Sequence, residues 1–324
     1  MTSAPQLRTL HRPLVWFAAL MAALALVCVG GLALDDRVLV GVPIWAKPLK
    51  FALSFIAYGL TLAWMLSLLP GTRARRAGWW AGTVLTVASA LEMVVITGQV
   101  IRGRQSHFNV GTPFDATLFQ IMGATVAVLW LAALVIAVLL LRARILDRAT
   151  AWAVRLSSLI ALAGAAIGFV MTQPTAGQRA QDKPGIVGAH SVGVPDGGPG
   201  LPLIGWSTTG GDLRVAHFFG MHALQLIPLL LLALAALAPR FARLADDRVR
   251  LRLVLVASGA YAAVFALIAW QALRGQPLLS PDATTLGAAG AIAVATAVGT
   301  ALALRLPRMR PGAPAGRTRE TQAA

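Results

Sequence analysis

Cysteine and acidic residues are scarce in this sequence. The single cysteine, Cys28, lies inside an apolar run. One cysteine excludes an intrachain disulfide and a metal site built from cysteine ligands. Charged residues make up only 12% of the chain, and the 12 aspartates and glutamates are outnumbered by 28 lysines and arginines. The formal net charge of +16 invites comparison with nucleic-acid-binding proteins.

Long apolar runs are what the sequence has in abundance. Apolar residues make up 57% of the chain. They recur in runs of about 20, which is the length that a bilayer core requires of a helix. The basic residues are distributed over the short loops between these runs. We therefore expect a lipid bilayer, and not a nucleic acid, as the partner of the chain.

The hydropathy pattern predicts an all-α, polytopic transmembrane bundle of eight helices. The first run is too long for the core of a signal peptide, so we expect it to remain as an uncleaved helix. The last run is rich in glycine and alanine, a composition typical of a tightly packed helix. The expected helices span residues 14–34, 49–70, 79–102, 115–141, 151–172, 213–237, 253–273 and 286–305.

The loops alternate in charge along the chain. Those that share a side with the two termini carry about twice as many lysines and arginines as those on the other side. The positive-inside rule therefore predicts that both termini are cytoplasmic. Trp79 and Trp80 fall at the expected inner interface, and Trp45 and Trp206 at the outer one. This distribution agrees with the aromatic belts of membrane proteins.

A short phrase occurs twice, as QVIRG at residues 99–103 and as QALRG at residues 271–275. Each phrase is followed by a loop and the sequence Asp-Ala-Thr. This duplication suggests two parallel four-helix repeats, which we assign to residues 1–148 and 149–306. The tail, residues 307–324, is rich in proline, glycine and arginine, and we expect it to be a disordered cytoplasmic segment.

Polar side chains within the expected helices define two tiers of candidate residues. Ionisable groups are costly inside a bilayer and are therefore functional candidates. Glu92 and His222 lie at similar depth and are the candidate catalytic groups. The outer tier contains Arg102, Arg104, His107, Asp115, Asp212, Arg214 and His217, and the deep tier contains Tyr58, Glu92, Gln99, His222 and Gln225. We expect all of the outer tier, together with Tyr58, Gln99 and Gln225, to bind a ligand.

The inner half of helix 213–237 has no polar side chain, which argues against a channel. The sequence instead predicts a pocket that opens to the outer side and receives a small-molecule ligand there. The long outer loop, residues 173–212, is rich in glycine and proline. Loops of this length are usually functional or disordered, and we expect this one to form an ordered lid over the pocket.

Structural roles for several of these residues stay open at this point. Ion pairs across tight helix connections would explain the repeated phrase, and the candidates are Arg102 with Asp115 and Arg274 with Asp282. Glu92 could have a purely structural role, in which its carboxylate only satisfies a neighbouring side chain such as His222 or Tyr58.

Three functions are compatible with the pattern. The favoured one is a redox cofactor of haem b or quinone type, with His107, His217 and His222 as haem or metal ligands. The second is an anion transporter or receptor with basic groups at its mouth. The third is a metal-dependent hydrolase or transferase acting on a lipid-like substrate, with zinc as the candidate metal and His107, His190, His217 and Asp212 as candidate ligands. His217 and His222 are five residues apart, so they cannot chelate one metal in the i, i+4 manner of a zinc helix. Enzymatic activity and oligomeric state stay open.

Three phrases resemble those of uncharacterised bacterial multi-pass membrane proteins. They are WAKPLKFALS at residues 45–54, QSHFNVGTPFD at residues 105–115 and GWSTTGGDLRVAHFFGMHALQ at residues 205–225. The resemblance covers most of the chain and implies a location in the bacterial inner membrane. It implies no activity, cofactor or site residue. The chain lacks the paired histidines of dihaem cytochromes b and a retinal-type lysine in its last helices.

Overall fold

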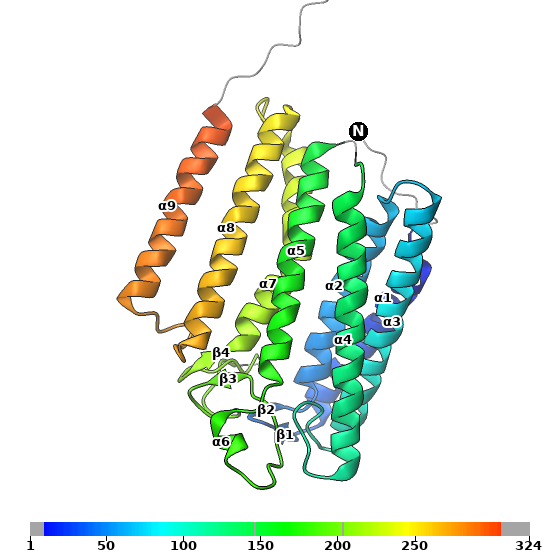
Figure 1. The fold of residues 1–324 in the computed structure, drawn as a ribbon, viewed down its shortest axis with the longest axis vertical. Coiled ribbons are helices and arrows are strands. Elements are labelled where there is room, and N and C mark those ends of the chain that lie inside the picture. Colours follow the sequence, from blue (N-terminus) through cyan, green and yellow to red (C-terminus); the bar gives the residue numbers. More distant parts are fainter. Residues whose placement is uncertain (1–9, 146, 203, 306–324) are drawn as a thin grey trace, which may run out of the picture.

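Eight long helices run side by side in the structure, a computed structural model that describes residues 10–145, 147–202 and 204–305 (Figure 1). The model is 71% helical, and all eight helices are long and apolar enough to cross a bilayer. The predicted multi-pass helical bundle is thereby confirmed. The predicted tail 307–324 lies outside the described residues. The helices are α1 (Arg12–Leu34), α2 (Ala46–Ser67), α3 (Thr72–Ile101), α4 (Pro113–Arg142), α5 (Arg148–Met171), α7 (Leu213–Leu237), α8 (Asp247–Leu273) and α9 (Ala283–Arg305).

Capping residues set several helix starts. Asp147, Asp212 and Asp246 precede α5, α7 and α8, and each accepts a hydrogen bond from a backbone N–H of the first turn. Such a cap satisfies a donor that the start of a helix leaves unpaired. α3 and α8 begin about two turns before the predicted 79 and 253. Arginines continue both helices beyond their apolar spans, joined by alanines in α3, because both residue types are good helix formers.

The two halves of the chain pack their helices in the same order. In the first half α1 packs on α2 and α3, α2 packs on α3, and α3 packs on α4. In the second half α5 packs on α7 and α8, α7 packs on α8, and α8 packs on α9. The halves meet where α4 contacts α5 and where α2 contacts α7. The repeat itself stays a prediction, with which this packing order agrees.

The two ends of the bundle differ. The start of α1 and the end of α9 lie at one end, here called the terminal end, and all the strands lie at the other, the loop end (Figure 1). The loop end carries a short helix and two antiparallel two-stranded hairpins. These are α6 (Ala176–Arg179), β1 (Val38–Leu39) with β2 (Val42–Pro43), and β3 (Ser191–Val192) with β4 (Gly211–Asp212).

The long loop before α7 is folded against the bundle. Its backbone bonds to the α3–α4 loop through Val110 N to Gly185 O, at 3.0 Å, and Val187 N to Phe108 O, at 2.8 Å. The β3–β4 hairpin continues directly into α7. We call the described part of residues 172–212 the cap.

Apolar packing closes the terminal half of the bundle. One core cluster joins Leu66 of α2, Leu140 of α4, Val154 of α5 and Leu224 of α7, all buried. Trp130 of α4 donates a hydrogen bond from Nε1 to a backbone carbonyl of α5 at 3.1 Å. This core agrees with the prediction of a pocket that ends inside the bundle.

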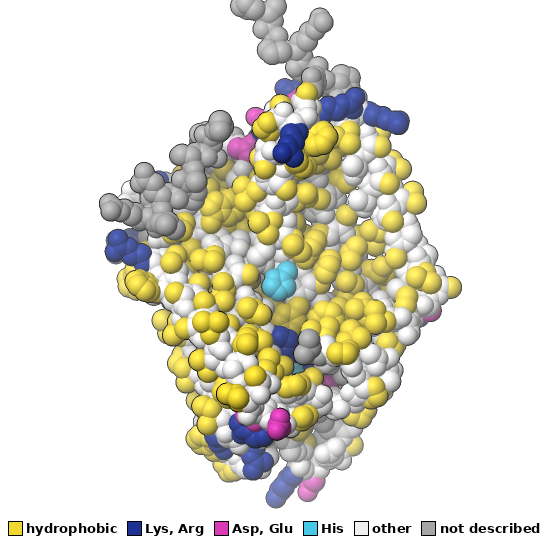
Figure 2. All heavy atoms as spheres, turned by 180° about the vertical axis from the view of Figure 1, so that it is seen from behind, with side chains coloured by type: hydrophobic (Ala, Val, Ile, Leu, Met, Phe, Trp, Pro, Cys, Tyr) yellow, Lys and Arg dark blue, Asp and Glu magenta, His cyan; other side chains and the backbone are white. Residues whose placement is uncertain are grey.

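The sides of the bundle expose large apolar side chains, as contact with lipid requires. Leu26, Val94 and Leu131 are 75%, 69% and 55% exposed in mid-helix. Figure 2 shows one such face, with apolar side chains over most of it and charged side chains gathered toward the ends. A histidine is visible about midway, where the surface is hollowed (Figure 2). His217 and His222 are the two histidines that lie within spanning helices.

Candidate functional site

Polar side chains from four elements lie near one another toward the loop end, and that of Glu92 lies deeper, nine residues before the end of α3. α2 contributes Lys47, α3 contributes Glu92, the α3–α4 loop contributes His107, the cap contributes His190, and α7 contributes His217. Burial lowers the pKa of His107 well below its usual range, and the nearby charges of Lys47, His190 and His217 lower it further. The charge of Glu92 also acts on Lys47. We call these five residues the polar site; three of them, Glu92, His107 and His217, belong to the predicted set.

Hydrogen-bond partners decide which ring nitrogen of each histidine carries the proton. His217 Nδ1 lies 2.8 Å from the carbonyl oxygen of Gly164. A carbonyl only accepts, so Nδ1 donates and Nε2 of the neutral ring keeps a lone pair. His107 Nδ1 lies 3.1 Å from the Lys47 ammonium, which only donates, so its hydrogen is on Nε2. The polar site therefore offers one imidazole acceptor and one imidazole donor.

Glu92 is the carboxylate of the polar site and is only 2% exposed. Its Oε1 accepts a hydrogen bond from the Thr125 hydroxyl of α4. Among the described residues it makes no hydrogen bond with His222 or Tyr58, the partners suggested by the sequence. A carboxylate buried with one neutral donor is costly in a membrane protein, which makes Glu92 a candidate for binding protons or a ligand.

Gln99, Arg102 and Asp115 form a closed network at the end of α3, which we call the latch. Asp115 is 2% exposed and accepts hydrogen bonds from Arg102 at 2.8 Å and from Gln99 Nε2 at 2.9 Å. Gln99, which was predicted for the deep tier, lies in the last turn of α3, and its Nε2 also donates to the carbonyl oxygen of Gln105 at 3.1 Å. The buried groups of the latch satisfy one another, while the Arg102 side chain stays 41% exposed.

The duplicated phrase builds the same connection in both halves. The predicted ion pairs are present, Arg102 with Asp115 at 2.8 Å and Arg274 with Asp282 at 2.5 Å. The glycine that follows each arginine has a positive φ, 68° in the first half and 74° in the second. Glycine adopts this conformation without steric cost and commonly ends helices in this way. The structural interpretation of the phrase is thereby confirmed.

Asp212 and Arg214 anchor the cap to the start of α7. Asp212 is 3% exposed, and both of its carboxylate oxygens accept hydrogen bonds from the Arg214 guanidinium. Arg214 also donates to the carbonyl oxygen of Gly205 in the cap. Lys50 of α2 donates to the carbonyl oxygen of Ile204 at 3.0 Å. Asp212 and Arg214 were predicted to bind a ligand, and the structure pairs their charges with each other.

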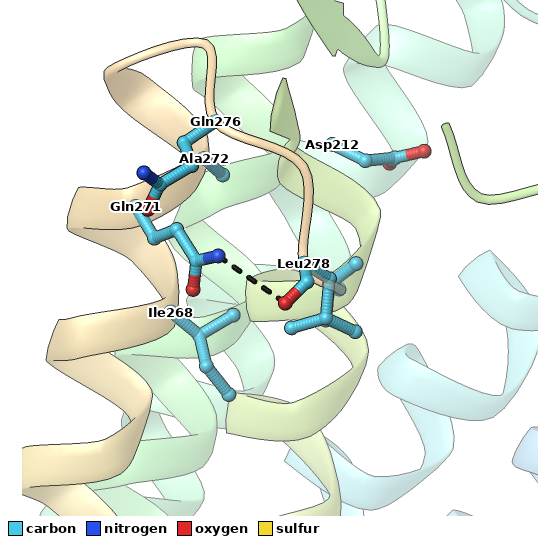
Figure 3. Close-up of a pocket in the computed structure, with 7 residues that line it drawn as sticks. Asp212, Ile268, Gln271, Ala272, Gln276 and Leu278 are labelled. Carbon is cyan, nitrogen blue, oxygen red and sulfur yellow. Dashed lines mark hydrogen bonds between the residues drawn. The ribbon is translucent and has the colours of Figure 1, made fainter. Parts of the chain in front are cut away.

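A small cavity lies beside this anchor, between the start of α7 and the α8–α9 connection (Figure 3). Gln271 Nε2 crosses it to donate to the carbonyl oxygens of Pro277, at 2.7 Å, and Leu278, at 3.3 Å. Its volume of about 10 Å³ suffices for one water molecule. An organic ligand does not fit there. The lining residues drawn with labels are Asp212, Ile268, Gln271, Ala272, Gln276 and Leu278.

The remaining predicted residues lie apart from these networks. His222 Nδ1 lies 3.2 Å from Gln225 Oε1, while Gln225 Nε2 is buried without an acceptor in the described part of the chain. Tyr58 packs, half-buried, against the apolar core. Arg104 is exposed just after α3.

The metal alternative finds no support in the geometry. The described residues hold no group of three or more His, Cys, Asp or Glu side chains arranged around a possible metal ion. Zinc centres in proteins use at least three such ligands. His107, His217 and His222 therefore do not form a zinc site in this arrangement.

Lys47 and Thr125 belong to the site but not to the predicted set. A lysine at the start of a membrane helix is ordinarily explained by a side chain that reaches the interface. A threonine in mid-helix ordinarily bonds its own backbone, as Thr125 also does to Ile121 O. One signal was present: Lys47 and Lys50 are three residues apart, so they neighbour each other on the surface of α2.

The His190–Asp196 pair should make the cap sensitive to pH. His190 Nδ1 lies 2.9 Å from Asp196 Oδ2. Burial lowers the pKa of His190; the bond to Asp196 opposes this shift, and the charges of Arg214 and Lys47 add to it. Because the folded pKa lies below the unfolded value of about 6.5, the unfolded state binds the proton first. The contribution of His190 to stability is complete above about pH 6.5 and is lost as the pH falls below it.

We therefore expect amide hydrogen exchange in the cap to accelerate between about pH 7.5 and pH 5, after correction for intrinsic rates. His190→Asn should remove most of this dependence, and exchange in α5 should serve as an internal control. An equal pH response in the variant and the wild type would show that another group controls the cap.

The fold and the site define a multi-pass helical membrane protein with a buried polar site at one end. Comparisons with protein-family models, curated proteins and solved structures gave no match.

Proposed function

We propose that the polar site binds the head group of a quinone-type redox carrier. The observation that carries this proposal is the pair of opposite imidazole tautomers, with an acceptor at His217 Nε2 and a donor at His107 Nε2. A quinone carbonyl accepts a hydrogen bond, and a hydroquinone hydroxyl donates one. A site with both kinds of partner suits the head group in either oxidation state.

Other polar groups add to this donor and acceptor set. Lys47 contributes an ammonium donor and Glu92 a carboxylate. A bound quinone supplies the two-electron chemistry, while these side chains bind and orient it and hold protons. The neutral imidazole of His217 and the ionised carboxylate of Glu92 are the groups able to take up a proton from a hydroquinone.

The charge distribution supports an orientation for this site. With the basic loops in the cytoplasm of a bacterium, the loop end faces the outer side of the inner membrane. The matched packing of the two halves supports a parallel repeat of residues 1–148 and 149–306.

Titration of the purified protein in nanodiscs with ubiquinone-1 tests the proposal, with quenching of tryptophan fluorescence as the readout. We expect saturable quenching. His217→Ala should weaken binding about tenfold, the equivalent of about 1.4 kcal/mol, through loss of the Nε2 acceptor. His11→Asn is the matched control, because His11 caps α1 at the terminal end and lies outside the polar site.

Absence of saturable quenching, or equal affinity in His217→Ala and wild type, would contradict quinone binding. The absorption spectrum separates the haem alternative. A Soret band in the purified protein that disappears in His217→Ala or His222→Ala would favour haem b.

Lys47 and Lys50 favour a second candidate, an anionic solute. Among the described residues neither lysine forms an ion pair, since their ammonium groups contact only His107 and the carbonyl oxygen of Ile204. Two neighbouring cations in a partly buried site attract an anion. Because apolar packing closes the terminal half of the bundle, an anion receptor is favoured over an anion transporter. Calorimetric binding of sulfate that is lost in Lys47→Gln would support it.

A further inference from the structure

A groove runs between α1 and α3 on the membrane-facing surface. These helices pack against each other at the edge of the bundle (Figure 1). The groove has a volume of about 410 Å³, within the range of small-molecule sites. Its walls are apolar and include Leu20, Leu24, Val94, Gly98 and Ile101. In a spanning bundle this surface faces acyl chains, so the groove has the width and chemistry to hold one.

Arg37 contacts the loop end of the groove, and Arg104 follows close by in the sequence. Arg37 donates to the carbonyl oxygen of Ile101, which lines the groove, at 3.2 Å. Arg37 is 46% exposed and also pairs with Asp35. Arg104 follows three residues after Ile101, is exposed, and forms no ion pair with the described residues. A guanidinium with free donors at the end of a spanning helix is placed to bind a phosphate.

Thr97 is the one hydroxyl on the groove wall. Its Oγ1 is buried and has no hydrogen-bond partner among the described residues. Thr97 lies one turn below Ile101, about 6 Å along the helix. From the loop end inward, the groove therefore presents a cationic group, then a hydroxyl without a partner, then apolar walls.

We propose that this groove binds one bilayer phospholipid. The lipid phosphate lies against Arg104 and Arg37, an ester carbonyl accepts from Thr97, and one acyl chain fills the apolar part. The order of these groups along a glycerophospholipid is the order in which the groove presents their partners. The proposal is independent of the quinone site, because the groove is lined by different residues.

Native mass spectrometry of the full chain with added phosphatidylglycerol tests the proposal. Gly98→Phe is the main variant, because a Cβ at Gly98 meets no atom within 4 Å and a large ring there fills the groove without an internal clash. Gly123→Phe on α4 is the matched control, because its Cβ is equally free. We expect wild type and Gly123→Phe to retain one bound lipid and Gly98→Phe to lose it.

The head-group contact is tested separately. Arg104→Ala should weaken phosphatidylglycerol binding about fivefold, while inorganic phosphate should neither bind nor displace the lipid. Equal lipid retention in Gly98→Phe and Gly123→Phe would overturn the proposal. Val94→Trp replaces Gly98→Phe if that variant fails to fold. Unchanged affinity in Arg104→Ala, or phosphate binding as tight as that of the lipid, would overturn the assignment of the phosphate.

Discussion

Gly164→Val is expected to separate α5 from α7 and to cost about 3 kcal/mol of stability or more. A Cβ at Gly164 would lie 2.5 Å from the carbonyl carbon of Gly220 and from the backbone nitrogen of Met221. The approach is mutual, because a Cβ at Gly220 would lie 2.6 Å from the Gly164 Cα. Backbone atoms cannot yield as a flexible side chain does, so one helix must move. Small residues permit such close contacts between membrane helices.

The same change should disturb the polar site. His217 on α7 donates to the carbonyl oxygen of Gly164 itself, so displacement of α7 breaks this 2.8 Å bond and frees the imidazole to change tautomer. We therefore expect Gly164→Val to weaken ubiquinone-1 binding as well as to lower the unfolding temperature.

Thermal unfolding in detergent, followed by circular dichroism, measures the effect on stability. Gly123→Val is the control, since its Cβ meets no atom within 4 Å and the glycine also lies in a spanning helix. The control should unfold close to the wild-type temperature. If both variants unfold together, close packing of α5 on α7 does not limit stability.

Asp212→Ala is expected to cost about 3–5 kcal/mol and to release the cap. The carboxylate is 3% exposed and is the ion-pair partner of Arg214, which is itself 22% exposed. Its removal leaves a largely buried guanidinium without a counter-charge, the costly half of a broken buried pair. It also removes the N-cap of α7 and the acceptor for the backbone N–H of Ser207.

Asp246→Ala separates the capping effect from the charge effect. Asp246 caps α8 as Asp212 caps α7: each carboxylate accepts a hydrogen bond from the backbone N–H two residues later. Unlike Asp212, Asp246 forms no ion pair among the described residues. Its loss should cost about 1 kcal/mol, the usual contribution of a cap. Hydrogen exchange in the cap should accelerate in Asp212→Ala alone. Similar losses of stability in both variants would mean that the Arg214 charge is solvated without its partner.

The helices were predictable because a helix needs about 20 consecutive, mostly apolar residues to cross a bilayer, and such runs are visible in the sequence. The ion pairs of the two connections were predictable as well, because repetition of the phrase indicated a shared local structure. Helix starts were less predictable. α3 and α8 extend beyond their apolar spans, where arginines favour helix but lower the hydropathy.

The composition of the site was only partly predictable. Glu92, His107 and His217 were identified because ionisable groups stand out in apolar segments. Gln99 was assigned to the deep tier because it shares a helix face with Glu92, but its amide bonds to Gln105 and Asp115 of the α3–α4 connection, and the sequence did not show the fold of that connection. Lys47 was overlooked as a site residue, because a lysine at a helix start has a sufficient explanation at the interface.

The sequence by itself determined the class of the protein, its eight spanning helices, the asymmetry of basic loops and the apolar second half of α7. These properties are local, and each follows from the cost of placing polar groups in hydrocarbon. Only the tertiary structure decided that Lys47 meets His107 and that Thr125 meets Glu92. Such partners lie on different elements, and helix packing through residues such as Gly164 and Gly220 brings them together.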